Sequence, residues 1–391
     1  MYSRKYNEIA SIISEYNPFH KGHEFHIRKT KENTGAKYVI ALMSGDFTQR
    51  GLPAVFDKFV RAEMALRGGA DLVIELPCVY ATSSAEGFAK GAVDLLNKLN
   101  CVDYLSFGSE CGDVRTLTSC AKLLCEVPDK TDALIKEKIK EGLSYPRARQ
   151  EAFTESSYDV SVLNFPNNIL AIEYLRAMIL SESKISPVTV KRDDNGYNSS
   201  EIDTSKAFNS ASSIRRKIYE KDDVFRKFVP DNILPLYDSS VSGLYDYDAL
   251  IYQALLRKSA SGYADILDVN CDLSNRITKS LKDYETAEQF ISILKSKNYT
   301  HSRLTRALIH ILLDINNEPV KEASYARVLG FKKESAELLK ILKDNSSLPI
   351  ITKLADSKEY DYLSIDIKAA NLYCNVNKTY LNEMRRSPVI I

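Results

Sequence analysis

The stretch IASIISEYNPFHKGHEFHIRKTK, residues 9–31, decides the first structural unit of this 391-residue chain. Its apolar start, IASIIS, is typical of a buried β-strand. The proline after it restricts the backbone, and the glycine of HKGH allows the chain to approach a ligand closely. A helical stretch, HEFHIRKTK, follows directly. The sequence therefore predicts a strand, a tight turn and a helix, with three of the chain's five histidines at the turn or just after it.

The same alternation continues along the first half of the chain. Further buried-strand runs are YVIALMS (38–44), LVIELP (72–77), YLSFGS (104–109) and PVTVKR (187–192). Helical patterns lie between them at 54–69, 83–99 and 167–179. The second helical pattern begins with Ser83 and Glu86 at the spacing of a capping box. Strands that alternate with helices predict an α/β fold with a doubly wound parallel sheet.

The second half of the chain has a different pattern. Helical periodicity dominates beyond about residue 235, for example at 247–259, 286–297 and 302–315. We therefore predict two domains, an α/β domain over 1–235 and a mainly α-helical domain over 236–391. Small strands are expected near residues 348–353 and 360–366.

The composition is that of an ordinary globular protein, with 44% hydrophobic and 27% charged residues. The net charge of +1 neither supports nor excludes nucleic acid as a partner. No apolar run has membrane-spanning length, and the N-terminus lacks the apolar core of a signal peptide. The seven cysteines form no CxxC pair, which is typical of reduced thiols. We expect a cytoplasmic protein with no membrane partner.

Polar residues gather where the predicted strands end: Glu15 and Asn17, residues 44–46, residues 108–110, and Arg192. Ligands bind at this edge of open α/β sheets. The polar residues are also compatible with ordinary surface loops. We expect them to share one pocket.

The HKGH turn has three possible uses. Because it opens a helix, its free backbone N–H groups can bind an anion, and His20 and His23 can donate to phosphate oxygens as charge develops on leaving pyrophosphate. A zinc site needs further ligands, and the cysteines lie far away in sequence. Plain packing of the histidines is the third interpretation. The position of the turn between a strand and a helix favours phosphate.

A second candidate anion site lies at FNSASSIRRK, residues 208–217. Ser210, Ser212 and Ser213 precede a helix that carries Arg215 and Arg216, so hydroxyl groups and guanidinium groups could hold a polyphosphate. Serine is also a favoured helix cap, so a capped surface helix is the alternative. Together with the histidine turn, the pattern favours the polyphosphate site.

These two features resemble the HxGH nucleotidyltransferase-like superfamily, whose Rossmann-like core transfers adenylyl groups from ATP. A closer resemblance is to the bacterial tRNA(Met) cytidine acetate ligase family. It rests on EYNPFHKGH, MSGDFTQRGLPAVFDKFVRAEMALRGGADLVIELP, FGSE, FPNNILAIEYLRA and SASSIRRK, in this order, with SRLTRALIHILL and ARVLGFKKES in the tail. It covers nearly the whole chain.

The resemblance implies a ligase with two steps. Acetate attacks the α-phosphate of ATP to give acetyladenylate and pyrophosphate. The exocyclic amine of the wobble cytidine in elongator tRNA(Met) then takes the acetyl group and releases AMP. ATP is the nucleotide substrate, and Mg²⁺ is expected with it. Two alternatives stay open: a small-molecule adenylyltransferase of the HxGH superfamily, and a nucleotide-sensing protein without catalysis.

The resemblance also implies site residues. The ATP-binding segment falls on Ile13, Ser14, Glu15, Tyr16, Asn17, Pro18, Phe19, His20, Lys21, Gly22, His23, Glu24, Phe25 and His26. Further ATP contacts fall on Gly108, on Asn167 with Asn168 as the second choice, and on Arg192. The serine-arginine stretch adds Ser212, Ser213 and Arg215. Where the family pattern reads Gly-Tyr-His, this chain has Gly196, Tyr197 and Asn198, which puts a histidine role there in doubt.

Catalysis is expected from His20 and His23. Lys21 could stabilise phosphate charge or be a solvated turn residue. Asp46 could hold a magnesium ion or the acceptor, or simply be part of a turn. No residue is assigned to a protein-bound metal.

A basic face for RNA is expected on the helix over 302–315, where Arg303 and Arg306 are one turn apart. A solvated amphipathic helix is the alternative interpretation, and the resemblance favours RNA. Further basic residues in the tail are Arg327, Lys332, Lys333, Arg385 and Arg386.

Overall fold

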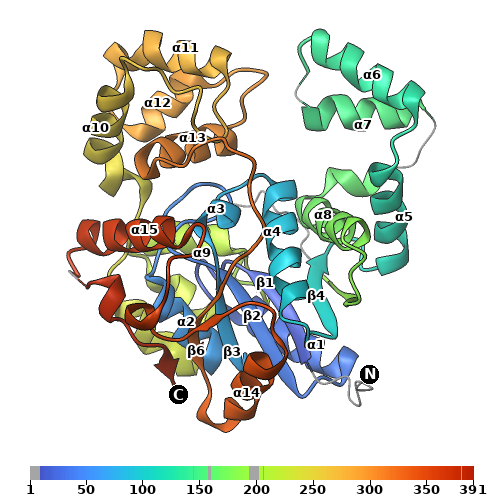
Figure 1. The fold of residues 1–391 in the computed structure, drawn as a ribbon, viewed down its shortest axis with the longest axis vertical. Helices are drawn as coiled ribbons and strands as arrows, with labels where there is room; N and C mark the ends of the chain where they lie inside the picture. Colours follow the sequence, from blue (N-terminus) through green and yellow to red (C-terminus); the bar gives the residue numbers. More distant parts are fainter. Residues whose placement is uncertain (1–8, 144, 157–159, 193–201, 206, 380) are drawn as a thin grey trace.

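The computed structural model describes residues 9–143, 145–156, 160–192, 202–205, 207–379 and 381–391. Its centre is a mostly parallel sheet with the strand order β5-β4-β1-β2-β3-β6-β7, and β8 pairs with β6 (Figure 1). The parallel strands from the first half are β1 (Ile9–Ser14), β2 (Tyr38–Ser44), β3 (Leu72–Leu76), β4 (Tyr104–Ser109) and β5 (Ser186–Lys191). Because β1 lies between β4 and β2, the chain winds outward in both directions, which confirms the predicted doubly wound fold.

Both faces of the sheet are covered, which explains the continuous apolar runs of the strands. Every residue of β2 is buried. Ile40 and Leu42 pack into the core on one face, whereas Val39, Ala41 and Met43 pack into a second core on the other. Successive side chains of a strand point to opposite faces, so one strand supplies both cores.

The helices of the first half are α1 (Lys21–Thr34), α2 (Lys58–Arg67), α3 (Cys78–Ala81), α4 (Ala85–Lys98), α5 (Val114–Cys125), α6 (Asp129–Lys140), α7 (Tyr145–Glu155), α8 (Pro166–Leu180) and α9 (Ala211–Tyr219). Helix α4 begins one residue later than the capping-box pattern predicted. Ser84 caps it and accepts a hydrogen bond from the Gly87 N–H at 3.2 Å, whereas the Ser83 hydroxyl donates to the Val79 carbonyl.

The second half first forms a group of helices, α10 (Asp248–Lys258), α11 (Cys271–Ser280), α12 (Ala287–Leu294) and α13 (His301–Leu313). In Figure 1 this group and the α6–α7 hairpin project from the same end of the molecule. The chain then adds β6 (Ala326–Phe331), α14 (Ala336–Asn345), β7 (Ile350–Ile351), α15 (Leu363–Val376) and β8 (Val389–Ile390). Short 3-10 helices lie at Ser161–Asn164, Asp223–Phe228, Asp231–Asp238, Leu244–Tyr247, Leu281–Asp283, Lys333–Ser335, Leu354–Asp356 and Glu383–Arg385.

The sheet crosses the predicted domain division between residues 235 and 236. Strand β6 pairs antiparallel with β3, and β7 and β8 pair with β6. The last 66 residues, 326–391, thus complete the sheet that the first half begins. The strand at 326–331 was missed, and the small strand expected near 360–366 is wrong, because α15 starts there. The strand expected near 348–353 is confirmed by β7.

None of the helices in the described ranges is both long and apolar enough to span a bilayer.

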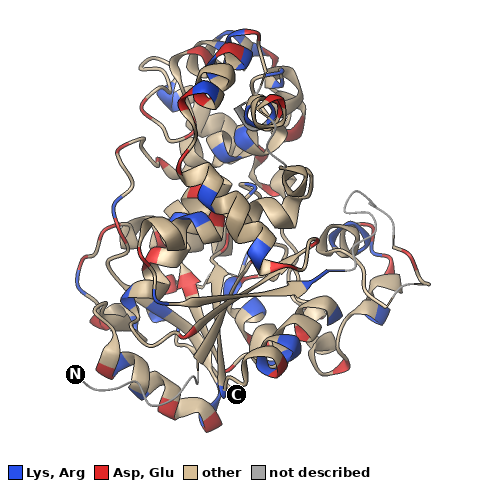
Figure 2. Cartoon of the chain, turned by 90° about the vertical axis from the view of Figure 1, so that its right-hand side faces the viewer, with Lys and Arg blue, Asp and Glu red and all other residues tan. Residues whose placement is uncertain are grey.

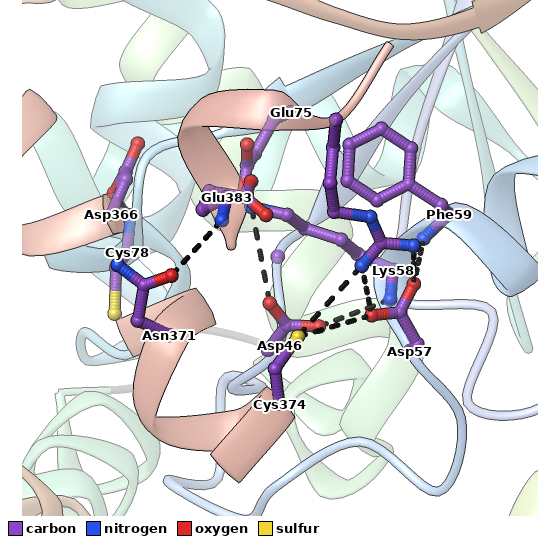
Figure 3. A network of polar contacts seen from close by, with 12 residues as sticks. Asp46, Asp57, Lys58, Phe59, Glu75, Cys78, Asp366, Asn371, Cys374 and Glu383 are labelled. Atoms are coloured by element: carbon purple, nitrogen blue, oxygen red, sulfur yellow. Dashed lines mark hydrogen bonds and ion pairs between the residues drawn. The ribbon is translucent and has the colours of Figure 1, made fainter. Parts of the chain in front are cut away.

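A buried group of charged side chains joins both ends of the chain (Figure 3). Lys58, which is fully buried on α2, places its Nζ 2.7 Å from Glu75 Oε1 and 2.7 Å from Glu383 Oε1. Arg327 of β6 also contacts both carboxylates, at 3.1 Å from Glu75 Oε2. Burying charges is costly unless they are paired. Here two cations and two carboxylates compensate each other, and they hold the C-terminal segment against β3.

The pKa shifts follow from this pairing. Burial and Arg327 lower the pKa of Lys58, but the carboxylates of Glu75, Glu383 and Asp46 outweigh them, so it is raised overall. Burial raises the pKa of Glu383, yet Lys58 and Arg327 bring it down to about 2. Lys58 and Glu383 are therefore charged at neutral pH.

Replacing Lys58 with methionine should lower the free energy of unfolding by about 3–5 kcal/mol, because two buried carboxylates would lose a cation. Urea denaturation followed by circular dichroism measures the change. Lys37→Met is the control, since Lys37 forms an exposed ion pair with Glu337 and its loss should change little. Equal effects of the two substitutions would contradict a special role for the buried group.

Candidate active site

A cavity of about 550 Å³ lies where β1, β4 and β5 end. It brings together most of the predicted site residues. Those that line it are Ile13, Ser14, Glu15, Tyr16, Asn17, His20, His23, His26, Gly108, Asn167, Arg192, Ser212 and Arg215. Of the polar residues expected to share a pocket, Glu15, Asn17, Gly108 and Arg192 line this cavity, whereas residues 44–46, Ser109 and Glu110 do not.

The two histidines of the turn cap helix α1 reciprocally. His20 Nδ1 accepts a hydrogen bond from the Gly22 N–H at 3.0 Å, and His23 Nδ1 accepts one from the His20 N–H at 3.3 Å. A ring nitrogen that accepts a hydrogen bond carries no proton, so each neutral imidazole carries its proton on Nε2. Because both residues line the cavity, the turn supplies it with imidazole N–H donors.

Glycine is required inside HKGH for space. A Cβ atom at Gly22 would lie 2.8 Å from Cε1 of His20, closer than such atoms approach in proteins. Any larger residue would push the His20 ring away from its capping position. The glycine of the motif is thus explained by its contact with the His20 ring.

The histidines are neutral at physiological pH. Burial, assisted by the charges of Arg192 and Arg215, lowers the pKa of His20 to about 3. Burial and the neighbouring His20 lower the pKa of His23 well below its usual value, and burial with Arg192 lowers that of His26 to about 3. They can therefore donate hydrogen bonds to an anion, but they are poor proton donors to a leaving group.

Two arginines complete the polar wall. Arg192 lies 3.5 Å from Asn167 Oδ1, and its side chain crosses Gly108, where a Cβ atom would come within 2.8 Å of Arg192 Cδ. Arg215 donates to the carbonyl of Asn17 at 2.6 Å and to the Ser212 hydroxyl at 3.0 Å. Guanidinium groups beside neutral N–H donors form a site for polyphosphate.

Several predicted residues do not line the cavity. They are Pro18, Phe19, Lys21, Gly22, Glu24, Phe25, Asn168 and Ser213. Lys21 donates from Nζ to the carbonyl of Lys227 at 2.7 Å, so the structure does not bring its charge to the phosphate site. Asn168 is buried and accepts from the Cys111 N–H, so of these two neighbouring asparagines it is Asn167 that lines the cavity. The predicted loop at Gly196, Tyr197 and Asn198 lies outside the described residues.

The carboxylates differ in their surroundings. Asp46 is buried, and its Oδ1 accepts the Lys58 N–H at 3.0 Å. Burial raises the pKa of Asp46 to about 7. It accepts the N–H of the first residue of α2, whose N-cap is Asp57, and it does not line the cavity. Glu15 is the carboxylate among the lining residues, where its Oε1 accepts the Gln49 N–H at 2.8 Å. One carboxylate fits a magnesium ion that ATP carries on its phosphates.

The zinc interpretation gains nothing from the geometry. Within the described ranges, His, Cys, Asp and Glu form no group of three or more that could hold a metal ion. The Nδ1 atoms of His20 and His23 are engaged by backbone N–H groups.

Arg61 of α2 is a further residue of this edge that its sequence pattern did not indicate. This guanidinium is fully buried and donates to the carbonyls of Phe56 at 2.9 Å, Glu15 at 2.7 Å and Ser44 at 3.0 Å, and also to that of Gly45. Glu15 and Ser44 mark the ends of β1 and β2. Arg61 thus fixes the loop that carries the histidine turn, but an arginine in a helical pattern gives no signal of this.

The structure corrects the RNA-binding prediction for Arg306. Its side chain is buried, and it forms a two-pronged pair with Asp268 at 2.7 and 3.2 Å. Arg303 lies half-buried and donates to the Asp268 carbonyl at 3.3 Å. Arg327 belongs to the buried charged group, and Arg386 pairs with Asp57. Figure 2 shows basic and acidic residues interspersed over the helices.

The chain is similar to known proteins over nearly its whole length. The model of the family described as HIGH Nucleotidyl Transferase matches residues 7–387. A tRNA(Met) cytidine acetate ligase of Clostridium perfringens is 40% identical, covering 94% of this chain and 95% of its own. One from Thermoanaerobacter sp. is 43% identical over 90% of each chain. A crystal structure of Thermotoga maritima TmcAL bound with alpha-thio ATP superimposes with a TM-score of 0.88 at 30% identity, covering 98% of this chain and 99% of that one. The chain therefore belongs to the tRNA(Met) cytidine acetate ligase family of HIGH nucleotidyl transferases.

Proposed function

We propose that this chain is a cytoplasmic ATP-dependent ligase that activates acetate and acetylates the wobble cytidine of elongator tRNA(Met). The observation that carries the proposal is the convergence of His20, His23, Arg192 and Arg215 on one cavity. The names of the relatives support the ligase and its tRNA substrate, and the ATP analogue of the Thermotoga maritima structure supports the nucleotide.

In the first step an acetate oxygen attacks the α-phosphorus of ATP, and the bond from that phosphorus to the bridging oxygen breaks. Pyrophosphate leaves with the electron pair of this bond, so no proton is required. The neutral imidazole N–H groups strengthen their hydrogen bonds as charge develops on the leaving oxygens. Arg192 and Arg215 hold the polyphosphate in line for the attack. Magnesium that enters with ATP would neutralise phosphate charge. Glu15 is the carboxylate among the lining residues, and it would help to bind this ion.

In the second step the exocyclic amine of cytidine attacks the acetyl carbonyl of acetyladenylate. A bond forms between nitrogen and carbon, and the bond from the acetyl carbon to the phosphate oxygen breaks. AMP leaves as the phosphate anion with that electron pair, and the amine releases one proton to water. The mixed anhydride is strongly activated, so holding the two reactants in contact supplies much of the rate. The cavity is the place where both would meet.

A small-molecule adenylyltransferase is the second candidate. The burial of Arg306 favours it, because this arginine is then not available on an RNA-binding surface. It would use the same phosphate site with a different acceptor.

The identity of the donor nitrogen generates a prediction for catalysis. His23→Asn should reduce the turnover of acetate-dependent ATP–pyrophosphate exchange by about 10²–10³-fold, with a small change in KM for ATP. His23→Gln should retain more activity, because the glutamine amide can place an N–H near the position of Nε2. The control is His301→Ala, which removes an exposed histidine paired with Glu288. Equal losses in both His23 variants would contradict the Nε2–H assignment.

The lowered histidine pKa values generate a prediction for stability. Between pH 6.5 and about 3, the unfolded chain protonates His26 but the folded chain does not, so its contribution to the free energy of unfolding falls as the pH falls. From pH 7.0 to 5.5, wild type should lose about 1 kcal/mol more than His26→Asn. Urea denaturation of both proteins at the two pH values measures this. Parallel losses would mean that His26 titrates normally in the folded chain.

The acceptor is tested with ATP, magnesium, labelled acetate and bulk bacterial tRNA, followed by nucleoside analysis. We expect label in acetylated cytidine, and its loss in His20→Ala, since that variant lacks one of the two phosphate donors. Consumption of ATP without label in RNA would instead favour the small-molecule transferase.

A further inference from the structure

The loop between β2 and α2 forms a rigid turn at the cavity wall. Phe47 and Pro53 pair as an antiparallel bridge, the Thr48 N–H donates to the Leu52 carbonyl at 2.9 Å, and the Gly51 N–H donates to the Thr48 carbonyl at 2.8 Å. These bonds place Gln49 and Arg50 at the centre of the turn.

The turn is anchored on three sides. The Gln49 N–H donates to Glu15, and its side chain donates to the Ser83 carbonyl at 2.9 Å. Gly51 has a left-handed φ of 77° and lies against α13, since a Cβ atom there would come within 2.6 Å of the Arg306 backbone nitrogen. A side chain at this position is therefore excluded by the backbone conformation and by the contact.

Arg50 stands at the tip of this turn. It lines the cavity and is exposed to solvent. Within the described part of the chain, its guanidinium makes no hydrogen bond, ion pair or ring contact. The other lining arginines, Arg192 and Arg215, are held by neighbouring polar groups. Arg50 thus offers five N–H donors to a ligand at the cavity rim.

Its position in the sheet separates Arg50 from the nucleotide side. The histidine turn follows β1, Gly108 lies on β4, and Arg192 follows β5, so the polyphosphate site extends from β1 toward β4 and β5. Arg50 follows β2, which is the neighbour of β1 on the opposite side. A second substrate that meets the nucleotide over β1 would approach from the β2 side.

We propose that Arg50 binds a phosphodiester group of the tRNA strand next to the target cytidine, and so serves acetyl transfer and not acetyladenylate formation. The inference rests on the proposed function. A planar guanidinium recognises phosphate through paired hydrogen bonds, and a wobble base is reached by splaying the strand and holding its backbone. Because the turn is already ordered, little backbone entropy is lost when Arg50 binds.

Two readouts test the proposal in the full-length protein. Arg50→Ala should raise KM for tRNA in acetylation about tenfold, the loss expected for one charge-assisted hydrogen bond. The slope of log KM against log salt should become shallower by about 0.7, the value for one single-strand phosphate contact. Acetate-dependent ATP–pyrophosphate exchange without tRNA should keep its wild-type rate. Arg50→Lys should recover part of the tRNA affinity, because it keeps the charge but loses the paired geometry.

The matched control is Arg115→Ala, which removes another exposed arginine that does not line the cavity. An equal rise in KM for tRNA in this variant would reduce the effect of Arg50 to general charge and overturn the proposal. Slowed pyrophosphate exchange in Arg50→Ala, with unchanged KM for tRNA, would assign Arg50 to the nucleotide and also overturn it. If wild type itself fails to acetylate tRNA but exchanges pyrophosphate, the proposed function fails at the acceptor, independently of the Arg50 variants.

Discussion

The active-site edge of the sheet depends on the buried guanidinium of Arg61. Carbonyl groups at strand ends lose their ladder partners, and burying them without a donor is costly. Arg61 donates to the carbonyls of Glu15, directly after β1, and of Ser44 and Gly45, at the end of β2. It also donates to the carbonyl of Phe56, just before its own helix. A single cation thus holds two strand ends and the start of α2 in one arrangement. The histidine turn follows one of these ends directly, so its position is set by this contact.

Helix α2 also links this edge to the other end of the chain. Lys58 lies one turn before Arg61 and pairs with Glu75 of β3 and with Glu383 near the C-terminus. Both cations are fully buried, because the sheet covers one face of α2 and the C-terminal segment covers another. The buried cations Lys58 and Arg61 therefore stabilise the fold, whereas Arg192 and Arg215 at the cavity are proposed to bind the ligand. Burial and the nearby arginines keep His20 and His23 neutral. The candidate anion site therefore has imidazole N–H donors that keep their proton when they bind a ligand.

The sequence correctly predicts those elements whose structure is determined by the local pattern of residues. All five parallel strands of the first half coincide with apolar runs to within one residue, and the HKGH turn lies where the strand-to-helix change placed it. The failures depend on distant partners. The short segment ARVLGF forms a strand because it pairs with the edge of β3. In α13, the face that carries Arg306 is buried, although the arginines in its sequence favoured an exposed face. Lys58 and Arg61 sit in KFVRAEMALR, a pattern that is common on surface helices, and their carboxylate and carbonyl partners lie far away in sequence or at strand ends. Asn167 and Asn168 differ only in the side of α8 that they occupy, which the sequence cannot distinguish without the helix in place.

The two substrates are proposed to bind on opposite sides of β1, and the C-terminal half of the chain contacts one of these sides. On the β4–β5 side, the residues proposed to bind the polyphosphate all belong to the part of the chain before residue 236. On the β2 side, the turn that presents Arg50 rests on the backbone of α13, and Ser302 of the same helix reaches the cavity. The helical group is thus built into the wall where the acceptor is proposed to enter. Its contribution does not require a row of exposed arginines, because Arg306, by pairing with Asp268, fixes the helix on which the turn rests. Arg306, first interpreted as an RNA contact, therefore acts indirectly: it positions α13, the helix against which the turn with Arg50 lies.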